Sequence, residues 1–122
     1  MNYQNAMEYR QRKKEIVALQ EQLSVLDSLY YSIDEAGKQI KRLSNNEWRT
    51  LDLKIKIYTA QCEQFERWLS SVPDRLIQTY MYMRFVDGLT WAHIGNKMRC
   101  KGPTARKAVQ RFFEKEARHN ED

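Results

Sequence analysis

Glycine and proline are scarce in this sequence, which has four glycines and two prolines among 122 residues. An all-β fold needs many tight turns built from these residues, so their scarcity argues against that class. No apolar run approaches the roughly 18 residues of a membrane span. The first residues also lack the apolar stretch of a secretion signal. We therefore expect an all-α protein that works in the cytoplasm and has no membrane partner.

Cysteine is scarce as well, with only Cys62 and Cys100. They lie far apart, and neither has a second cysteine or a histidine at the spacing of zinc ligands. We expect two reduced thiols, with Cys62 in a core. The chain also lacks a glycine-rich phosphate loop, a nucleophile with a partner histidine and paired carboxylates in a defined pocket. We therefore predict that the protein has no metal site and no cofactor, and that it is not an enzyme.

What the chain does have is two long stretches that repeat apolar residues in steps of three and four, the heptad spacing of packed helices. They predict helices over about residues 5–31 and 46–69. Neither helix can cover its apolar stripe alone, so they must pack on each other as an antiparallel hairpin, on a second copy, or both. The stripes are Ile16, Leu19, Leu23, Leu26, Tyr30 and Ile33 in the first helix, and Leu51, Ile55, Tyr58, Cys62, Phe65 and Leu69 in the second.

The join between these two helices carries two local signals. Gly37 is a residue type that commonly follows a helix end, and Ser44 with Glu47 has the spacing of a capping box that starts a helix. Together they predict a break within residues 33–46.

Pro73 marks the main boundary, because it restricts the residue before it to extended backbone and suits the first position of a helix. The sequence thus divides into a helical coiled-coil or oligomerisation region, residues 1–72, and a second domain, residues 73–122. In the second domain the helices are short, and Thr90 is a candidate cap for one of them. The expected helices cover about residues 74–86, 91–98 and 103–117.

Basic charge gathers in the second domain, where the net charge is +4 against +1 for residues 1–72. The last predicted helix places an apolar stripe with Val109 opposite a basic side, and the helix before it buries a face with Trp91. Two such helices joined by a short turn form a helix-turn-helix, whose second helix enters the DNA major groove. The predicted DNA-binding residues are Lys101, Thr104, Arg106, Lys107, Gln110, Arg111 and Lys115.

The segment from Met83 to Gly95 resembles the start of the helix-turn-helix in region four of sigma factors. It contains Gly88-Leu89-Thr90-Trp91 followed by Ile94-Gly95, and the resemblance covers about residues 75–115. The order of parts resembles phage late-gene transcription regulators of the ArpU/RinA-like kind. This resemblance implies a phage-encoded, sequence-specific regulator that binds double-stranded DNA at promoters in the host cytoplasm. The uncovered stripes of the N-terminal helices lead us to expect a homodimer formed through them. Part of the segment over residues 80–83 could form an exposed patch for RNA polymerase as a further partner.

Two features depart from that pattern. The turn over residues 99–103 lacks the usual Ser or Thr before the second helix, and Gly95 stands where alanine is common. We expect glycine in place of alanine at position 95 to have little effect on the helix-turn-helix fold.

Two other functions compete with DNA reading. Because more than half of the chain has the pattern of long paired helices, it could be a helical adaptor or anti-activator that binds RNA polymerase or a phage protein without reading DNA. A DNA-packaging subunit also combines a helix-turn-helix with helices that assemble. Binding to duplex DNA would distinguish the DNA-reading function from the adaptor function. A ring-sized oligomer would favour the packaging subunit.

Overall fold

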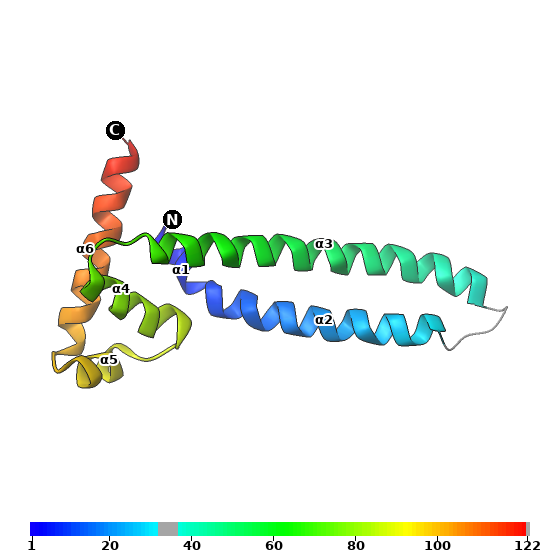
Figure 1. The fold of residues 1–122 in the computed structure, drawn as a ribbon, viewed down its shortest axis with the longest axis horizontal. Coiled ribbons are helices and arrows are strands. Elements are labelled where there is room, and N and C mark those ends of the chain that lie inside the picture. Colours follow the sequence, from blue (N-terminus) through cyan, green and yellow to red (C-terminus); the bar gives the residue numbers. More distant parts are fainter. Residues whose placement is uncertain (32–36, 122) are drawn as a thin grey trace. The chain divides into compact units, whose positions relative to one another are not determined.

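The computed structural model describes the backbone of residues 1–31 and 37–121 and the side chains of residues 1–28 and 46–119. Within those backbone ranges the chain is helical and forms no strand, which confirms the all-α prediction. None of the helices described there combines the length and the apolar character of a membrane-spanning segment. The elements are α1 (Tyr3–Met7), α2 (Tyr9–Tyr31), α3 (Gly37–Ser70), α4 (Arg75–Met81), the π-helical η1 (Tyr82–Val86), α5 (Trp91–Met98) and α6 (Gly102–Glu121) (Figure 1).

The first predicted helix begins earlier than residue 5 and is divided in two. Asn2 caps α1, since its side-chain oxygen accepts a hydrogen bond from the Asn5 amide at 2.8 Å. A turn at Glu8 then separates α1 from α2. Ala6 and Tyr9, on either side of that turn, are both buried. The first ten residues are therefore packed against other parts of the chain instead of extending as a solvated helix end.

The capping box predicted to start the second long helix does not do so. Because α3 runs unbroken from Gly37 to Ser70, Ser44 lies inside a helix and does not cap it, and Gly37 is the first residue of α3. Residues 38–43 are mostly good helix formers, and one cap contributes only about 1 kcal/mol, so helix continues through the capping-box sequence. The part of the predicted break over residues 33–36 lies outside the described residues.

Pro73 precedes the next helix instead of beginning it. Asp74 is the cap of α4, and its carboxylate accepts from the amides of Leu76 at 2.9 Å and Ile77 at 3.2 Å. The helix α4 passes directly into η1, so the two together occupy the predicted helix over residues 74–86. The wider π-helical turn carries Phe85, which is only 1% exposed.

The last two predicted helices are present with small shifts. The helix α5 has the predicted bounds, and α6 begins at Gly102, one residue before the predicted start at Pro103, and continues past residue 117. The Lys101 carbonyl accepts from the amide of Thr104 at 3.0 Å, so Lys101 immediately precedes the helix.

The chain divides into two compact units, one of residues 1–10 with 63–122 and one of residues 11–62. This differs from the predicted division between residues 72 and 73. The reason is aromatic packing: Tyr9 and Phe65 have ring centroids 4.6 Å apart, and Trp68 lies 5.4 Å from Phe113 of α6. Both ends of the predicted N-terminal region thus belong to the core that surrounds α6.

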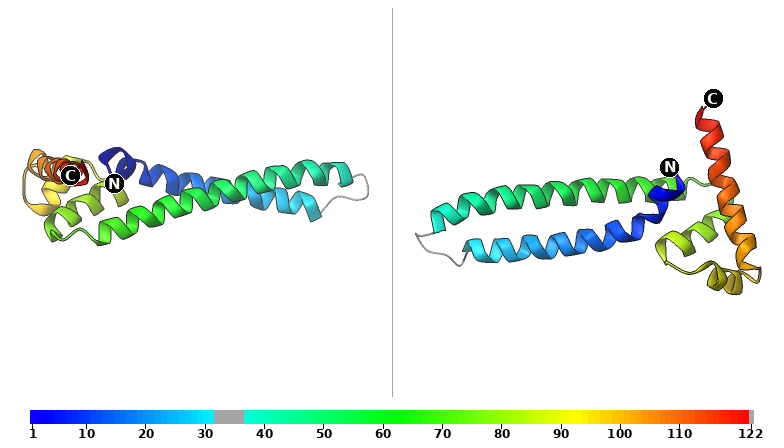
Figure 2. Two further views of the ribbon diagram at one scale, coloured as in Figure 1. Left: turned by 90° about the horizontal axis from the view of Figure 1, so that it is seen from above. Right: turned by 180° about the vertical axis from the view of Figure 1, so that it is seen from behind.

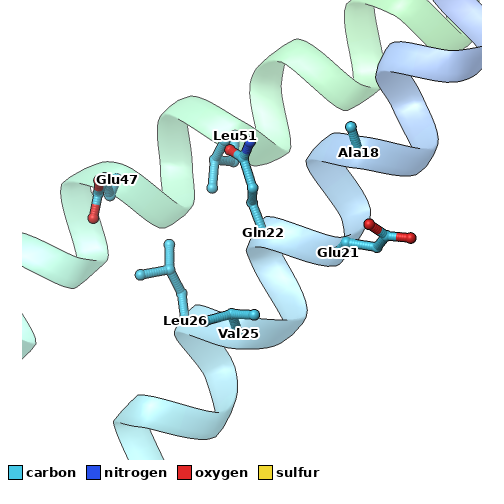
Figure 3. Close-up of a pocket in the computed structure, with 7 residues that line it drawn as sticks. All are labelled: Ala18, Glu21, Gln22, Val25, Leu26, Glu47 and Leu51. Carbon is cyan, nitrogen blue, oxygen red and sulfur yellow. The ribbon is translucent and has the colours of Figure 1, made fainter.

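In the unit of residues 11–62, α2 and α3 lie side by side in all the views of Figures 1 and 2. Gln22 and Leu26 extend from α2 toward α3, where Leu51 lies (Figure 3). No side chain described between residues 11 and 61 is fully buried, so the apolar stripes of this unit are only partly covered except at Cys62. An open groove of about 510 Å³ along the two helices is lined by Ala18, Glu21, Gln22, Val25, Leu26, Glu47 and Leu51.

Candidate nucleic-acid interface

The start of α5 is fixed by a side-chain cap. Thr90 has extended backbone, and its hydroxyl accepts from the His93 amide at 3.2 Å, which confirms the predicted cap. A threonine at this position satisfies an amide that no helical carbonyl can reach. Ile94 is completely buried, and Trp91 is half-buried. The helix therefore presents one apolar face to the core, as expected, and leaves the opposite face in solvent.

Arg84 holds the loop that leads into α5. Its guanidinium donates to the Leu89 carbonyl at 3.0 Å and lies 5.3 Å from the centre of the Trp91 ring, within cation–π range. The loop turns at Gly88, whose positive φ of 73° suits glycine. The Arg10 guanidinium packs directly on Gly88, where it occupies the space of a side chain. These contacts make Arg84 and Arg10 structural residues of the loop.

The turn between α5 and α6 is held by close backbone packing. An ideal Cβ at Gly95 would lie 2.7 Å from the Gly102 nitrogen, and one at Gly102 would lie 2.9 Å from the Trp91 carbonyl oxygen. Both distances are shorter than carbon atoms tolerate, so the two helices approach here only because both residues are glycine. The expectation that Gly95 has little effect is therefore wrong.

One side of α6 is buried over residues 105–113. Ala105 and Val109 are completely buried, and Phe113 is 8% exposed. Phe112, which the sequence places on the same stripe, is half-buried instead, and its ring lies 6.0 Å from that of Trp68. Two contacts thus hold the same side of α6. The helix α5 packs near its start, and an aromatic cluster packs further along.

That cluster explains why α6 is firmly positioned. Phe113 lies within 5.6 Å of Tyr3 and 6.1 Å of Phe85, both in edge-on geometry that aromatic rings favour. Trp68 stacks on Phe113, and its indole donates to the Glu116 carboxylate at 3.1 Å. The rings come from α1, α3, η1 and α6, so four elements fix the orientation of one helix.

The opposite side of α6 is the candidate interface. All seven predicted DNA-binding residues are exposed, and none of their side chains forms a hydrogen bond or ion pair among the contacts that the structure describes for the side chains of residues 1–28 and 46–119. At 3.6 residues per turn, Lys107 lies opposite the buried stripe. Arg106 and Gln110 flank it on one side. On the other side lie Thr104, Arg111 and Lys115.

Four exposed residues close to this side were not included in the predicted DNA-binding set. His93, Asn96 and Lys97 lie on the exposed side of α5, and Arg99 is exposed in the turn. Helical spacing from Ile94 could have placed the first three, but the backbone conformation of Arg99 has no signal in the sequence. The packing of Tyr3 was also missed, although Tyr3, Ala6 and Tyr9 recur in steps of three residues.

Tyr80 and Cys100 meet beneath the turn. The tyrosine hydroxyl lies 3.8 Å from the cysteine sulfur, and Tyr80 is 5% exposed. Burial raises the pKa of Tyr80, and the contact with Cys100 raises it further. Cys100 is half-buried, whereas Cys62 is buried as expected. The contact thus joins Tyr80 of α4 to the residue that follows Arg99 in the turn.

No group of three or more His, Cys, Asp or Glu side chains in the described part of the chain is arranged to hold a metal ion. Comparison with protein-family models, with curated proteins and with solved structures finds no match for this chain. Its function must therefore be inferred from the geometry and charge of its own residues.

Proposed function

We propose that this protein is a sequence-specific transcription regulator that binds double-stranded DNA, with α5 and α6 as a helix-turn-helix and α6 as the helix that enters the major groove. The observation that carries the proposal is the two-sided character of α6. Its apolar side is locked by α5 and the aromatic cluster, while its basic side is exposed and has no partner in the described part of the chain. Cations without internal partners are available to phosphates and to base edges.

Phosphate contacts supply much of the affinity in this proposal, and Lys107 with its neighbours supplies specificity. Arginine and lysine pair with guanine, and glutamine pairs with adenine. Base reading by these residue types fits their positions on α6, because Lys107 is central and is flanked by Arg106, Gln110 and Arg111. Action at promoters belongs to the same proposal through the resemblance of residues 75–115 to sigma factors. A phage origin and work in the host cytoplasm belong to it through the order of parts, and RNA polymerase is proposed as a further partner.

The test replaces Arg106, Lys107 and Arg111 together with alanine and measures binding to a DNA site selected from random duplexes by the wild-type protein. We expect each lost base contact to weaken binding by about 1–3 kcal/mol. The salt dependence should fall by about 0.9 in slope for each lost phosphate contact.

The matched control replaces three exposed basic residues of α2 and α3, Lys14, Arg49 and Lys54, so that it removes the same charge. Equal binding by the folded reader variant and the wild type would reject α6 as the reading helix. Failure of the wild-type protein to bind any duplex at about 0.1 M salt, where non-specific affinity is still measurable, would favour the adaptor function instead.

We further propose that the protein acts as a homodimer through residues 11–62. In this unit the described stripe residues of α2 and α3 other than Cys62 are only partly buried, and a second apolar row lies on the far side of α3. Leu53 and Ile57 in that row are 59% and 46% exposed. They stand four residues apart, and Ala60 continues the row at heptad spacing. A second copy would supply the two further helices that a four-helix arrangement needs to bury both sets of stripes.

The dimer is tested by Leu53→Glu with Ile57→Glu, compared with Ser24→Glu on an exposed side of α2. Sedimentation should give a dimer for the wild type and the Ser24 variant and a monomer for the double variant. A dimer is also expected to bind DNA sites with two half-sites about one helical turn apart. A wild-type monomer at micromolar concentration would contradict this arrangement, and a ring-sized oligomer would favour a packaging role.

A further inference from the structure

Arg99, in the turn between α5 and α6, has an unusual backbone. Its φ of 54° and ψ of 43° are left-handed, and it is the one non-glycine residue with positive φ in the described part of the chain. This conformation ends α5, because it lets the Cys100 amide donate to the Gly95 carbonyl at 2.9 Å. Glycine is the residue that ordinarily takes this position, and asparagine is the next most common.

The backbone therefore does not explain why arginine is present. An L-residue with a branched or long side chain is less stable than glycine in the left-handed region. The Arg99 side chain is exposed and forms no hydrogen bond or ion pair in the described part of the chain, so it contributes no visible contact to the fold. A residue that is unfavourable for the backbone and unused by the core is best explained by an external ligand.

The surroundings indicate what that ligand is. Lys97 in the last turn of α5 and Lys101 just before α6 are also exposed and without partners in the described residues. The three cations thus alternate with Met98 and Cys100 along five residues, with no acidic residue between them. The Gly95–Gly102 contact fixes this turn against α5. The ligand that matches such a row is a polyanion with repeated charges.

We propose that Arg99, together with Lys97 and Lys101, binds phosphates of the DNA backbone at the edge of the groove that α6 enters. This inference rests on the proposed function, because it places the phosphates beside a helix assumed to read DNA. The Arg99 guanidinium has a planar fork that fits two phosphate oxygens, and the left-handed turn presents it outward. Its contact sets the register of α6 on the duplex and carries no base information.

The decisive variant is Arg99→Gly, because it separates the backbone role from the ligand role. Glycine suits the left-handed position, so the variant should unfold at the same temperature as the wild type or a higher one. The same variant should bind the selected DNA site at least about threefold more weakly, and the slope of log K against log salt should fall by about 0.9. Arg99→Lys should keep the slope, and Lys14→Gln should leave both properties unchanged, which excludes a simple effect of net charge.

The outcomes separate this inference from the proposed function. If the wild type binds duplex DNA and Arg99→Gly binds it equally well with an unchanged salt slope, the phosphate site is overturned and α6 remains the reading helix. If the wild type binds no duplex DNA, the proposed function fails as a whole. Weaker binding by Arg99→Gly at every DNA sequence, including non-specific duplexes, supports a phosphate contact. Weaker binding at one base position alone would overturn it in favour of base reading.

Discussion

Replacement of Gly95 by alanine tests the packing of the α5–α6 turn. Position 95 is in the middle of a helix, where alanine is ordinarily more stable than glycine by about 0.8–1.0 kcal/mol. Local propensity therefore predicts a more stable protein. The structure predicts the opposite, because the added Cβ would lie 2.7 Å from the Gly102 nitrogen and 2.8 Å from the Cys100 carbonyl oxygen.

The expected loss in the free energy of unfolding depends on which atoms would have to move. Both neighbouring atoms belong to the backbone, and relief to an ordinary contact needs a shift of roughly 0.7 Å. The turn resists that shift, since the Cys100 amide is bonded to the Gly95 carbonyl and Gly102 packs on the Trp91 carbonyl. Overpacking costs about 1–3 kcal/mol, and rigid backbone neighbours place this site in the upper half of that range. After subtraction of the helix gain, we expect a net loss of about 1–2 kcal/mol.

The assay is urea unfolding followed by circular dichroism, with Asn96→Ala as the control. Asn96 is the next residue of α5 and is exposed, so its replacement offers the propensity gain without the close approach. The control should be at least as stable as the wild type, and Gly95→Ala clearly less stable. Equal stabilisation of both variants would show that the turn is loose, and the account of how α6 is positioned would then be wrong.

Three further predictions concern the core and its pH dependence. Tyr9→Phe removes the 2.6 Å hydrogen bond from the tyrosine hydroxyl to Glu66, and should lower the free energy of unfolding by about 1.5–3 kcal/mol in urea titration. Trp68→Phe removes the indole donor to Glu116, whose other carboxylate oxygen is buried without a partner, and should lower it by about 2 kcal/mol or more. Because the pKa of Tyr80 is raised in the folded state, its contribution is complete below about pH 10 and is lost as the pH rises above that value. Alkaline unfolding of the wild type should therefore be steeper than that of Tyr80→Phe, and equal curves would contradict the raised pKa.

The sequence predicted those features that depend on neighbours a few residues apart. The Thr90 cap, the bounds of α5 and the buried side of α6 all follow from local hydrogen bonding or from helical spacing, and the structure has them. Ser44 was misread for a related reason. A cap competes with the continuation of a helix, and its small local contribution is outweighed when good helix formers surround it.

The core of the candidate site could not be predicted in that way. Tyr3 contacts Phe113 across the whole length of the chain, and Trp68 meets Glu116 across 48 residues. Periodicity shows that a helix has a buried side, but it does not show which distant helix covers that side. The compact units divide the chain elsewhere than at residue 72, and the proline signal at residue 73 reports a local change of direction without showing which core the preceding helix joins.

Glycine and arginine both occupy unusual positions at the turn between α5 and α6. Glycine stands at position 95, inside a helix, where propensity disfavours it and only close packing of two backbones requires it. Arginine stands at position 99, where the left-handed backbone favours glycine and nothing in the described fold uses the side chain. Each choice costs local stability, so each needs a reason at a longer range. Packing supplies the first reason within the chain. The second has no such source among the described residues, and an anionic partner outside the chain is the cause that we propose for it.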